Sequence, residues 1–325
     1  MPTKSYAYSI GNVRAKEVSL LKRQDLEQML GFKTTKEMVA FLREKGFGNI
    51  SDSLLPDILK SETAKAWEYI RSVAPDFSLF TAFIIPNDYH NLKATLKGIV
   101  KGKDFENLLV TPCLVKTTDL KDAVSKKDFS KLPEYMKDAA NRAYDAFVKA
   151  GDVQLSDGIL DASCMEAQIK FASETKNEFL KRLINTEVFF NNFKIAIRAA
   201  RAKKNSEFLE SCLIKDDIID KKALKKAALM GESEVLTLLE TKTALDGDKA
   251  AEAYNKNPLE YERFVENYIM KIAREGKYVV MGAEALIGYL LARLCEIKAV
   301  RIIANGIATG LSEEEIRGML RELYG

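Results

Sequence analysis

The stretch from Asn257 to Gly306 decides the fold, and it reads NPLEYERFVENYIMKIAREGKYVVMGAEALIGYLLARLCEIKAVRIIANG. Asn257 is a preferred residue for the N-cap of a helix, and Pro258 suits the first helical position. Apolar residues then recur at helical spacing as far as Gly276, and a second apolar segment runs from Ala283 to Asn305. We therefore predict two long helices that are joined near Gly276.

The end of this stretch occurs three times along the chain, and we call it the first repeat marker. Its copies are Asn91–Lys97, Asn192–Arg198 and Glu296–Arg301. A weaker second repeat marker recurs with a similar spacing, at Ser19–Lys22, Cys113–Lys116 and Cys212–Lys215. Both markers share a period of about a hundred residues, and a fixed period of this kind indicates repeated structural units.

The two markers predict three units of similar construction, each a group of short helices followed by a pair of long helices. The predicted boundaries are 1–102, 103–204 and 205–325. No run of alternating β-branched residues interrupts the helical pattern, so we predict an all-α protein. Capping boxes predict two further helix starts, one at Thr34 with Glu37 and one at Ser312 with Glu315.

The first unit contains two segments whose helical limits are less obvious. Tyr6–Leu30 has apolar residues at helical spacing and is predicted as one helix that Gly31 ends. Phe77–Ile85 resembles a strand when it is taken alone. The other copies favour a helix there, with Pro86 starting a new turn.

The composition is that of an ordinary globular protein, and it excludes several classes. Apolar residues make up 47% and charged residues 30%, and 50 basic against 47 acidic side chains leave a net charge of +3. This balance gives no case for nucleic-acid binding. The N-terminus has no apolar signal segment, and no apolar run is long enough to span a bilayer, so we expect no transmembrane insertion.

The sequence shows no recognisable site for catalysis, a metal or a nucleotide cofactor. Gly98–Lys103 has the wrong spacing for a phosphate loop, and Gly306 with Gly310 is not a dinucleotide fingerprint. His90 is the only histidine, which cannot build a site of several histidines. The four cysteines are far apart, which favours reduced thiols in a protein core. We therefore expect no cofactor.

Basic residues recur on the first repeat marker. The pairs are Lys93 with Lys97, Lys194 with Arg198 and Lys298 with Arg301. Their spacing puts each pair on one helix face, where like charges repel by roughly 0.2–0.5 kcal/mol. Either the pairs face solvent near helix C-termini, where the helix dipole favours cations, or all three face a common axis or partner.

Four segments carry a resemblance to a known family. They are Tyr8–Glu17 (YSIGNVRAKE), Asn191–Ala199 (NNFKIAIRA), and the pair Glu296–Ile303 (EIKAVRII) and Gly310–Arg317 (GLSEEEIR). In this order they resemble the C subunit of V-type ATP synthases of archaea and bacteria, whose eukaryotic relative is the d subunit of the vacuolar ATPase. The resemblance spans residues 8–317.

This resemblance implies an all-α, funnel-shaped protein with three similar domains around a pseudo-threefold axis. It implies that the protein sits on the cytoplasmic end of the membrane rotor ring and receives the central shaft in its cavity. The implied partners are therefore the shaft subunits and the rotor ring, and the protein is peripheral to the membrane. The resemblance implies no catalytic residues in this chain.

The repeated polar residues then have a specific predicted role, as the wall of a water-filled socket for the shaft. Clustered like charges tolerate proximity only where water or an acidic partner lies between them. The predicted socket residues are Asn91, Lys93, Lys97, Asn192, Lys194, Arg198, Glu296, Lys298 and Arg301.

Two other functions compete with that of a rotor subunit. The first is a helical-repeat scaffold for other soluble partners, which would have more copies of a shorter period. The second is an enzyme whose site is not recognisable in the sequence.

Overall fold

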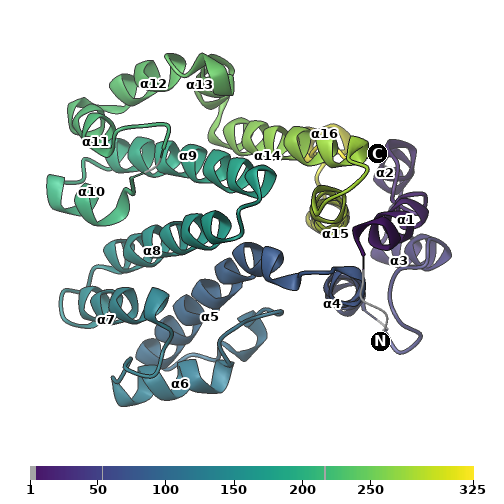
Figure 1. Ribbon diagram of the computed structural model, residues 1–325, viewed down its shortest axis with the longest axis horizontal. Coiled ribbons are helices and arrows are strands. Elements are labelled where there is room, and N and C mark those ends of the chain that lie inside the picture. Colours follow the sequence, from purple (N-terminus) through teal and green to yellow (C-terminus); the bar gives the residue numbers. More distant parts are fainter. Residues whose placement is uncertain (1–4, 53, 216) are drawn as a thin grey trace. The chain divides into compact units, whose positions relative to one another are not determined.

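The computed structural model describes residues 5–52, 54–215 and 217–325, and every regular element within these ranges is a helix. The prediction of an all-α protein is therefore confirmed. The chain divides into two compact units, which Figure 1 traces by element. One unit combines both ends of the chain, the segment ending at Phe77 and the segment Ala253–Gly325, and the other is Ser78–Glu252.

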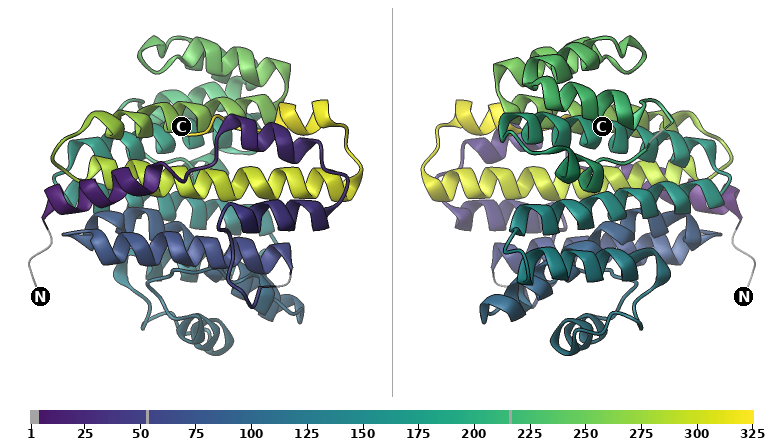
Figure 2. Two further views of the ribbon diagram at one scale, coloured as in Figure 1. Left: turned by 90° about the vertical axis from the view of Figure 1, so that its right-hand side faces the viewer. Right: turned by 90° about the vertical axis from the view of Figure 1, so that its left-hand side faces the viewer.

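The unit built from both chain ends is organised around its longest helix. Figure 2 (left) shows α15, in yellow, running across this unit with the purple N-terminal helices on either side of it. Buried side chains from α2, α3, α4 and α16 meet the apolar face of α15 around Val300 and Ile303. The helices are α1 (Tyr6–Glu17), α2 (Arg23–Leu30), α3 (Thr35–Glu44), α4 (Leu55–Val73), α14 (Pro258–Glu275), α15 (Glu284–Thr309) and α16 (Glu313–Met319).

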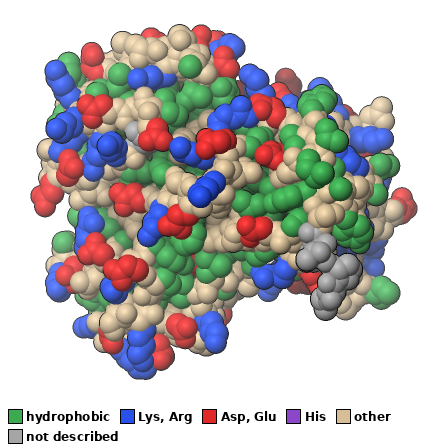
Figure 3. Space-filling model, viewed as in Figure 1, with side chains coloured by type: hydrophobic (Ala, Val, Ile, Leu, Met, Phe, Trp, Pro, Cys, Tyr) green, Lys and Arg blue, Asp and Glu red, His purple; other side chains and the backbone are tan. Residues whose placement is uncertain are grey.

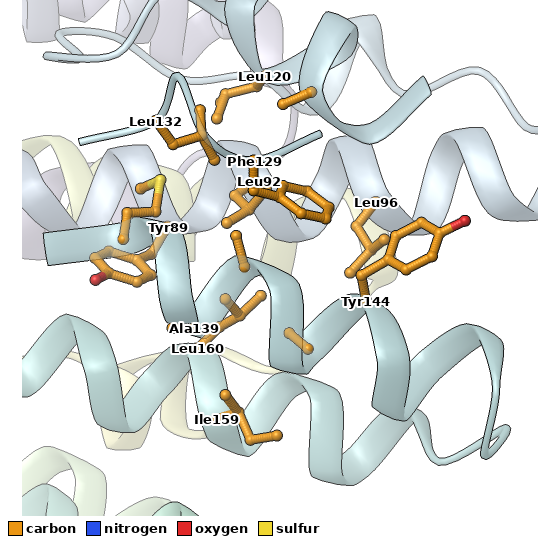
Figure 4. Close-up of a cluster of buried hydrophobic side chains, with 14 of the residues drawn as sticks. Tyr89, Leu92, Leu96, Leu120, Phe129, Leu132, Ala139, Tyr144, Ile159 and Leu160 are labelled. Carbon is orange, nitrogen blue, oxygen red and sulfur yellow. The ribbon is translucent and has the colours of Figure 1, made fainter. Parts of the chain in front are cut away.

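The unit Ser78–Glu252 combines long helices with a set of shorter ones. Its helices are α5 (Thr81–Lys101), α6 (Thr117–Lys126), α7 (Glu134–Val148), α8 (Val153–Glu174), α9 (Glu178–Arg201), α10 (Ser206–Cys212), α11 (Lys221–Met230) and α12 (Glu232–Glu240), and α13 (Gly247–Lys256) follows. Figure 4 shows its apolar core, where Tyr89, Leu92 and Leu96 of α5 face side chains of α6, α7 and α8.

Short 3-10 helices occur between the long helices in both units. They are η1 (Phe77–Phe80), η2 (Glu106–Leu108), η3 (Thr243–Leu245) and η4 (Gly276–Tyr278). The predicted joint near Gly276 is confirmed, because α14 ends at Glu275 and η4 begins at Gly276. The predicted division into units 1–102, 103–204 and 205–325 stays a prediction.

The local signals for helix starts are confirmed at three places. The Asn257 side chain accepts a hydrogen bond from the Leu259 amide at 2.7 Å, and Pro258 occupies the first helical position. Thr34 with Glu37 and Ser312 with Glu315 form reciprocal capping boxes. Each cap satisfies backbone amides that the first turn of a helix leaves without partners.

The prediction of one helix over Tyr6–Leu30 is wrong. The chain forms α1 and α2, and between them Lys22 is extended, with φ −103° and ψ 165°. Two contacts hold this break: the Asp25 carboxylate accepts from the Lys22 amide at 2.7 Å, and Glu296 of α15 accepts from the Leu21 amide at 2.5 Å. The apolar periodicity continues through Tyr6–Leu30, so it did not predict a break that depends partly on a distant side chain.

The helix predicted near Phe77–Ile85 is confirmed as η1 and the start of α5, but Pro86 does not begin a new turn. It lies inside α5. A proline has no amide hydrogen, so the Ala82 carbonyl four residues earlier lacks its helical donor. Gln168 of α8, which is 6% exposed, donates from Nε2 to that carbonyl at 3.2 Å. The replacement donor explains how the helix continues through the proline.

Candidate functional site: the polar stripe of the long helices

The first repeat marker forms a polar stripe on each of α5, α9 and α15. Each stripe begins with a buried polar side chain, at Asn91, Asn192 and Glu296, and basic residues follow two to six positions later. A buried polar group costs free energy unless it is hydrogen-bonded. The partners of these three side chains therefore show what the stripe does.

On α5, Asn91 binds both polar groups of one backbone residue. Its Nδ2 donates to the Val110 carbonyl at 3.0 Å, and its Oδ1 accepts from the Val110 amide at 2.8 Å. One turn earlier, Asp88 accepts from the Leu114 and Val115 amides at 2.8 and 3.1 Å and from the Tyr135 hydroxyl. Burial raises the pKa of Asp88, against these three hydrogen bonds.

On α9, Asn192 repeats this arrangement. Its Nδ2 donates to the Ile214 carbonyl at 3.0 Å, and its Oδ1 accepts from the Ile214 amide at 3.1 Å. Both residues are buried. An amide side chain suits this task because it supplies one donor and one acceptor without a charge.

On α15, Glu296 holds the backbone of the segment between α1 and α2 through the Leu21 amide. A buried carboxylate needs a counter-charge, and Arg293 supplies it: its Nη1 lies 2.5 Å from Glu296 Oε2 and its Nη2 lies 2.5 Å from Glu62 Oε2 on α4. Glu62 also accepts from the Gly48 amide and from Lys65 Nζ, each at 2.8 Å. Burial raises the pKa of Glu296 to about 7, although Arg293 opposes that shift.

On α9 and α15 these contacts join the two repeat markers, because Ile214 and Leu21 belong to the second one. On α5, Asn91 binds Val110, three residues before the second marker, and Asp88 binds the marker itself. We call the contacts of Asn91, Asn192 and Glu296 with the backbone at or just before the second marker backbone clamps. The sequence shows both markers but not which residues of one contact the other. Their shared period was the available signal, since two features that repeat together have equivalent partners in each copy.

Acids on neighbouring helices offset at least three of the six cations of the stripe, and the repeat pattern does not mark these acids. Lys93 and Lys97 of α5 pair with Asp161 and Asp157 of α8, the second pair at 2.6 Å. The two acids are four residues apart on α8, as the two lysines are on α5. Lys298 of α15 lies 2.5 Å from Glu266 of α14.

The remaining cations reach the surface to different extents. Arg198 and Arg301 are exposed, and Lys194 is half-buried; Lys194 and Arg198 also have interactions of their own. Figure 3 shows basic and acidic side chains interspersed over one face of the molecule, without an extended patch of one sign. The stripe is therefore a line of partly compensated cations.

Other kinds of site have little support in the described part of the chain. No group of three or more His, Cys, Asp or Glu side chains there is arranged to hold a metal ion. The four cysteines are free thiols, two buried and two half-buried. Among the described residues, no helix has the length and apolar character needed to cross a bilayer.

Comparisons with known proteins match almost the whole length of the chain. Residues 9–319 match the family described as ATP synthase (C/AC39) subunit. The C subunit of the V-type sodium ATPase of Enterococcus hirae is 20% identical over 318 residues, which cover 96% of this chain and 97% of that protein. The C subunit of the A-type ATP synthase of Thermococcus kodakarensis is 22% identical over 345 aligned positions, which cover 98% of this chain and 91% of that protein.

The matched range 9–319 spans the positions of both repeat markers and of the polar stripe. The chain belongs to the ATP synthase (C/AC39) subunit family.

Proposed function

We propose that this chain is a non-catalytic central-stalk subunit of a V-type ATPase or ATP synthase. It joins the central shaft to the membrane rotor ring, on the cytoplasmic face of the membrane. The observation that carries the proposal is the family match over residues 9–319, together with two full-length relatives that are named as the C subunits of ATP-driven or ATP-forming complexes. Its role in ATP-linked proton or sodium transport is mechanical, and other subunits supply the chemistry.

We further propose three similar domains around a pseudo-threefold axis. The three backbone clamps support this proposal, because α5, α9 and α15 each hold a residue outside the helices with a polar side chain at the start of the first repeat marker. Equivalent clamps orient equivalent helices in the same way. The cations that follow each clamp then take equivalent places around the axis.

The shaft contact in this proposal falls on the six basic residues of the stripe: Lys93, Lys97, Lys194, Arg198, Lys298 and Arg301. The other three predicted socket residues, Asn91, Asn192 and Glu296, are buried and bound to backbone groups. They position the helices and do not touch the shaft. Half-exposed ion pairs such as Lys97 with Asp157 contribute little to stability, so their cations can turn to an acidic partner at small cost.

Co-purification from membranes tests the function. An affinity tag on this chain is expected to recover both the shaft and the rotor ring from detergent-solubilised membranes. Recovery of neither, with other soluble proteins in their place, would favour the helical-repeat scaffold instead.

A charge-reversal pair tests the shaft contact. Lys194→Glu with Arg198→Glu is expected to weaken binding of the purified shaft by about tenfold or more at low salt, because electrostatic association is screened as ionic strength rises. The control is Lys222→Glu with Lys226→Glu, which reverses two exposed lysines four residues apart on α11. Equal shaft affinity in both variants would contradict a contact through the stripe.

A further inference from the structure

The turn between α14 and α15 exposes an unusual amount of apolar surface. Tyr278 and Val280 are each 85% exposed, and Met281 is 67% exposed. No other four consecutive residues among those described contain three large exposed apolar side chains. Ordered apolar groups that gather on a surface mark interaction sites more often than scattered ones do. We call residues 276–283 the apolar turn.

Hydrogen bonds to the rest of the chain hold the backbone of the apolar turn in place. Arg14 of α1 donates from Nη2 to the carbonyls of Gly276 and Lys277, at 2.9 and 2.6 Å, and also reaches that of Val279. Lys277 donates to the Tyr324 carbonyl, and its ammonium lies 4.5 Å from the centre of the Tyr324 ring. A binding surface that is ordered beforehand loses less conformational entropy when a partner docks.

The repeat supplies an internal comparison, because two other long helix pairs have turns of their own. Between α8 and α9 the turn is polar: Thr175 donates to the Ala172 carbonyl, and Asn177 caps α9. Between α4 and α5 the apolar residues Leu79 and Phe80 are buried. A helix pair therefore does not need exposed apolar residues in order to turn, and the third turn has them for another reason.

The chemistry of the apolar turn indicates an uncharged protein partner. Its exposed tip, residues 278–282, contains no charged side chain, and the Lys277 ammonium is already bound within the chain. A lipid surface is less suitable, because a small apolar anchor binds membranes only marginally unless basic groups assist it. An acidic or basic partner would find no complementary charge.

The apolar turn is also distant from the cations of α15 that are assigned to the shaft. Fourteen positions along α15 separate Glu284 from Lys298, which corresponds to about 21 Å of helix. Two partners can therefore bind this helix at the same time on separate surfaces.

We propose that the apolar turn is the part of this chain that docks on the rotor ring, with Tyr278, Val280 and Met281 making apolar contacts to it. This inference rests on the proposed function and assigns residues to one of its two partners. Because the contact is apolar, it is insensitive to salt, whereas the shaft contact is salt-sensitive.

The test is a triple variant of the full chain, Tyr278→Ser with Val280→Ser and Met281→Ser, isolated with its complex from solubilised membranes. Recovery of the rotor ring is expected to fall at least tenfold, while recovery of the shaft and the melting temperature stay unchanged. The control is Leu229→Ser with Met230→Ser, which removes exposed apolar side chains from α11 and is expected to leave ring recovery intact.

Three outcomes would overturn the inference. The first is unchanged ring recovery by the triple variant, and the second is an equal loss of shaft and ring in a variant that stays folded. The third is sedimentation of the wild-type chain, but not the triple variant, with protein-free phosphatidylcholine vesicles, which would make the turn a lipid anchor. Failure of the wild-type chain to recover either partner would instead refute the proposed function.

Discussion

The backbone clamps of α9 and α15 do the same task with different chemistry. Asn192 satisfies both the amide and the carbonyl of Ile214 without any charge. Glu296 can only accept, so it binds the Leu21 amide alone and brings a negative charge into the core. Arg293 neutralises that charge and in turn requires Glu62. One change from amide to carboxylate therefore demands a buried network of further charges.

The two clamps also differ in what they connect along the chain. Asn192 and Ile214 are 22 residues apart, whereas Glu296 and Leu21 are 275 residues apart. Closing the longer loop costs roughly 2 kcal/mol more chain entropy if each contact forms alone. The Glu296 clamp is thus the one that joins the two ends of the chain, and charged hydrogen bonds, which are stronger than neutral ones, suit that role.

The largest expected effect comes from removing the shared cation. Arg293→Ala leaves Glu62 and Glu296 buried without the guanidinium between them, and we expect a loss of about 3–5 kcal/mol in the free energy of unfolding. Chemical denaturation measures it, with the exposed Arg301→Ala as a control that changes stability by less than about 0.5 kcal/mol. A similar small loss in both variants would show that the network does not hold the chain ends.

Removing a neutral clamp should lower the free energy of unfolding by a smaller amount. Asn192→Ala leaves the buried amide and carbonyl of Ile214 unpaired, and we expect a loss of about 2–4 kcal/mol. Asn91→Ala should cost less, about 1–2 kcal/mol, because Val110 is only half-buried and water can replace the side chain. Equal losses at the two positions would argue against burial as the cause of the difference.

The charged clamp alone should respond to pH. The pKa of Glu296 is raised from 4.5 to about 7 in the folded chain, so between these values the folded state binds more protons than the unfolded state. Its contribution to stability is therefore complete below about pH 4.5 and is lost as pH rises to about 7, by about 1–3 kcal/mol. Glu296→Gln should flatten this part of the pH profile, as measured by denaturation from pH 5 to 8. An unchanged slope would refute the assignment of that proton to Glu296.

The smallest effect is expected outside the clamps. The ion pair of Lys97 with Asp157 is more than a third exposed at the lysine, and such pairs contribute about 0.2–1 kcal/mol. A double-mutant cycle with Lys97→Ala and Asp157→Ala measures the coupling. A coupling above about 2 kcal/mol would mean that these stripe cations serve the fold, which would weaken their proposed role toward the shaft.

The sequence determined the features that depend on neighbours along the chain. Asn257, Thr34 and Ser312 start helices because each cap bonds to amides within the next three residues. Apolar spacing predicted an all-α protein, and four segments together carried the resemblance to the family: Tyr8–Glu17, Asn191–Ala199, Glu296–Ile303 and Gly310–Arg317. The polar stripe was also visible, because it recurs at a fixed period.

Only the tertiary structure decided which distant groups meet. The apolar pattern continues across the break at Lys22, and one of the two carboxylates that stabilise the break belongs to Glu296 on a distant helix. In the same way, Pro86 stays inside α5 because Gln168 supplies the missing donor from α8. Helix starts follow from local hydrogen bonds, whereas the partner of a buried polar group is fixed by packing between segments that the sequence keeps far apart.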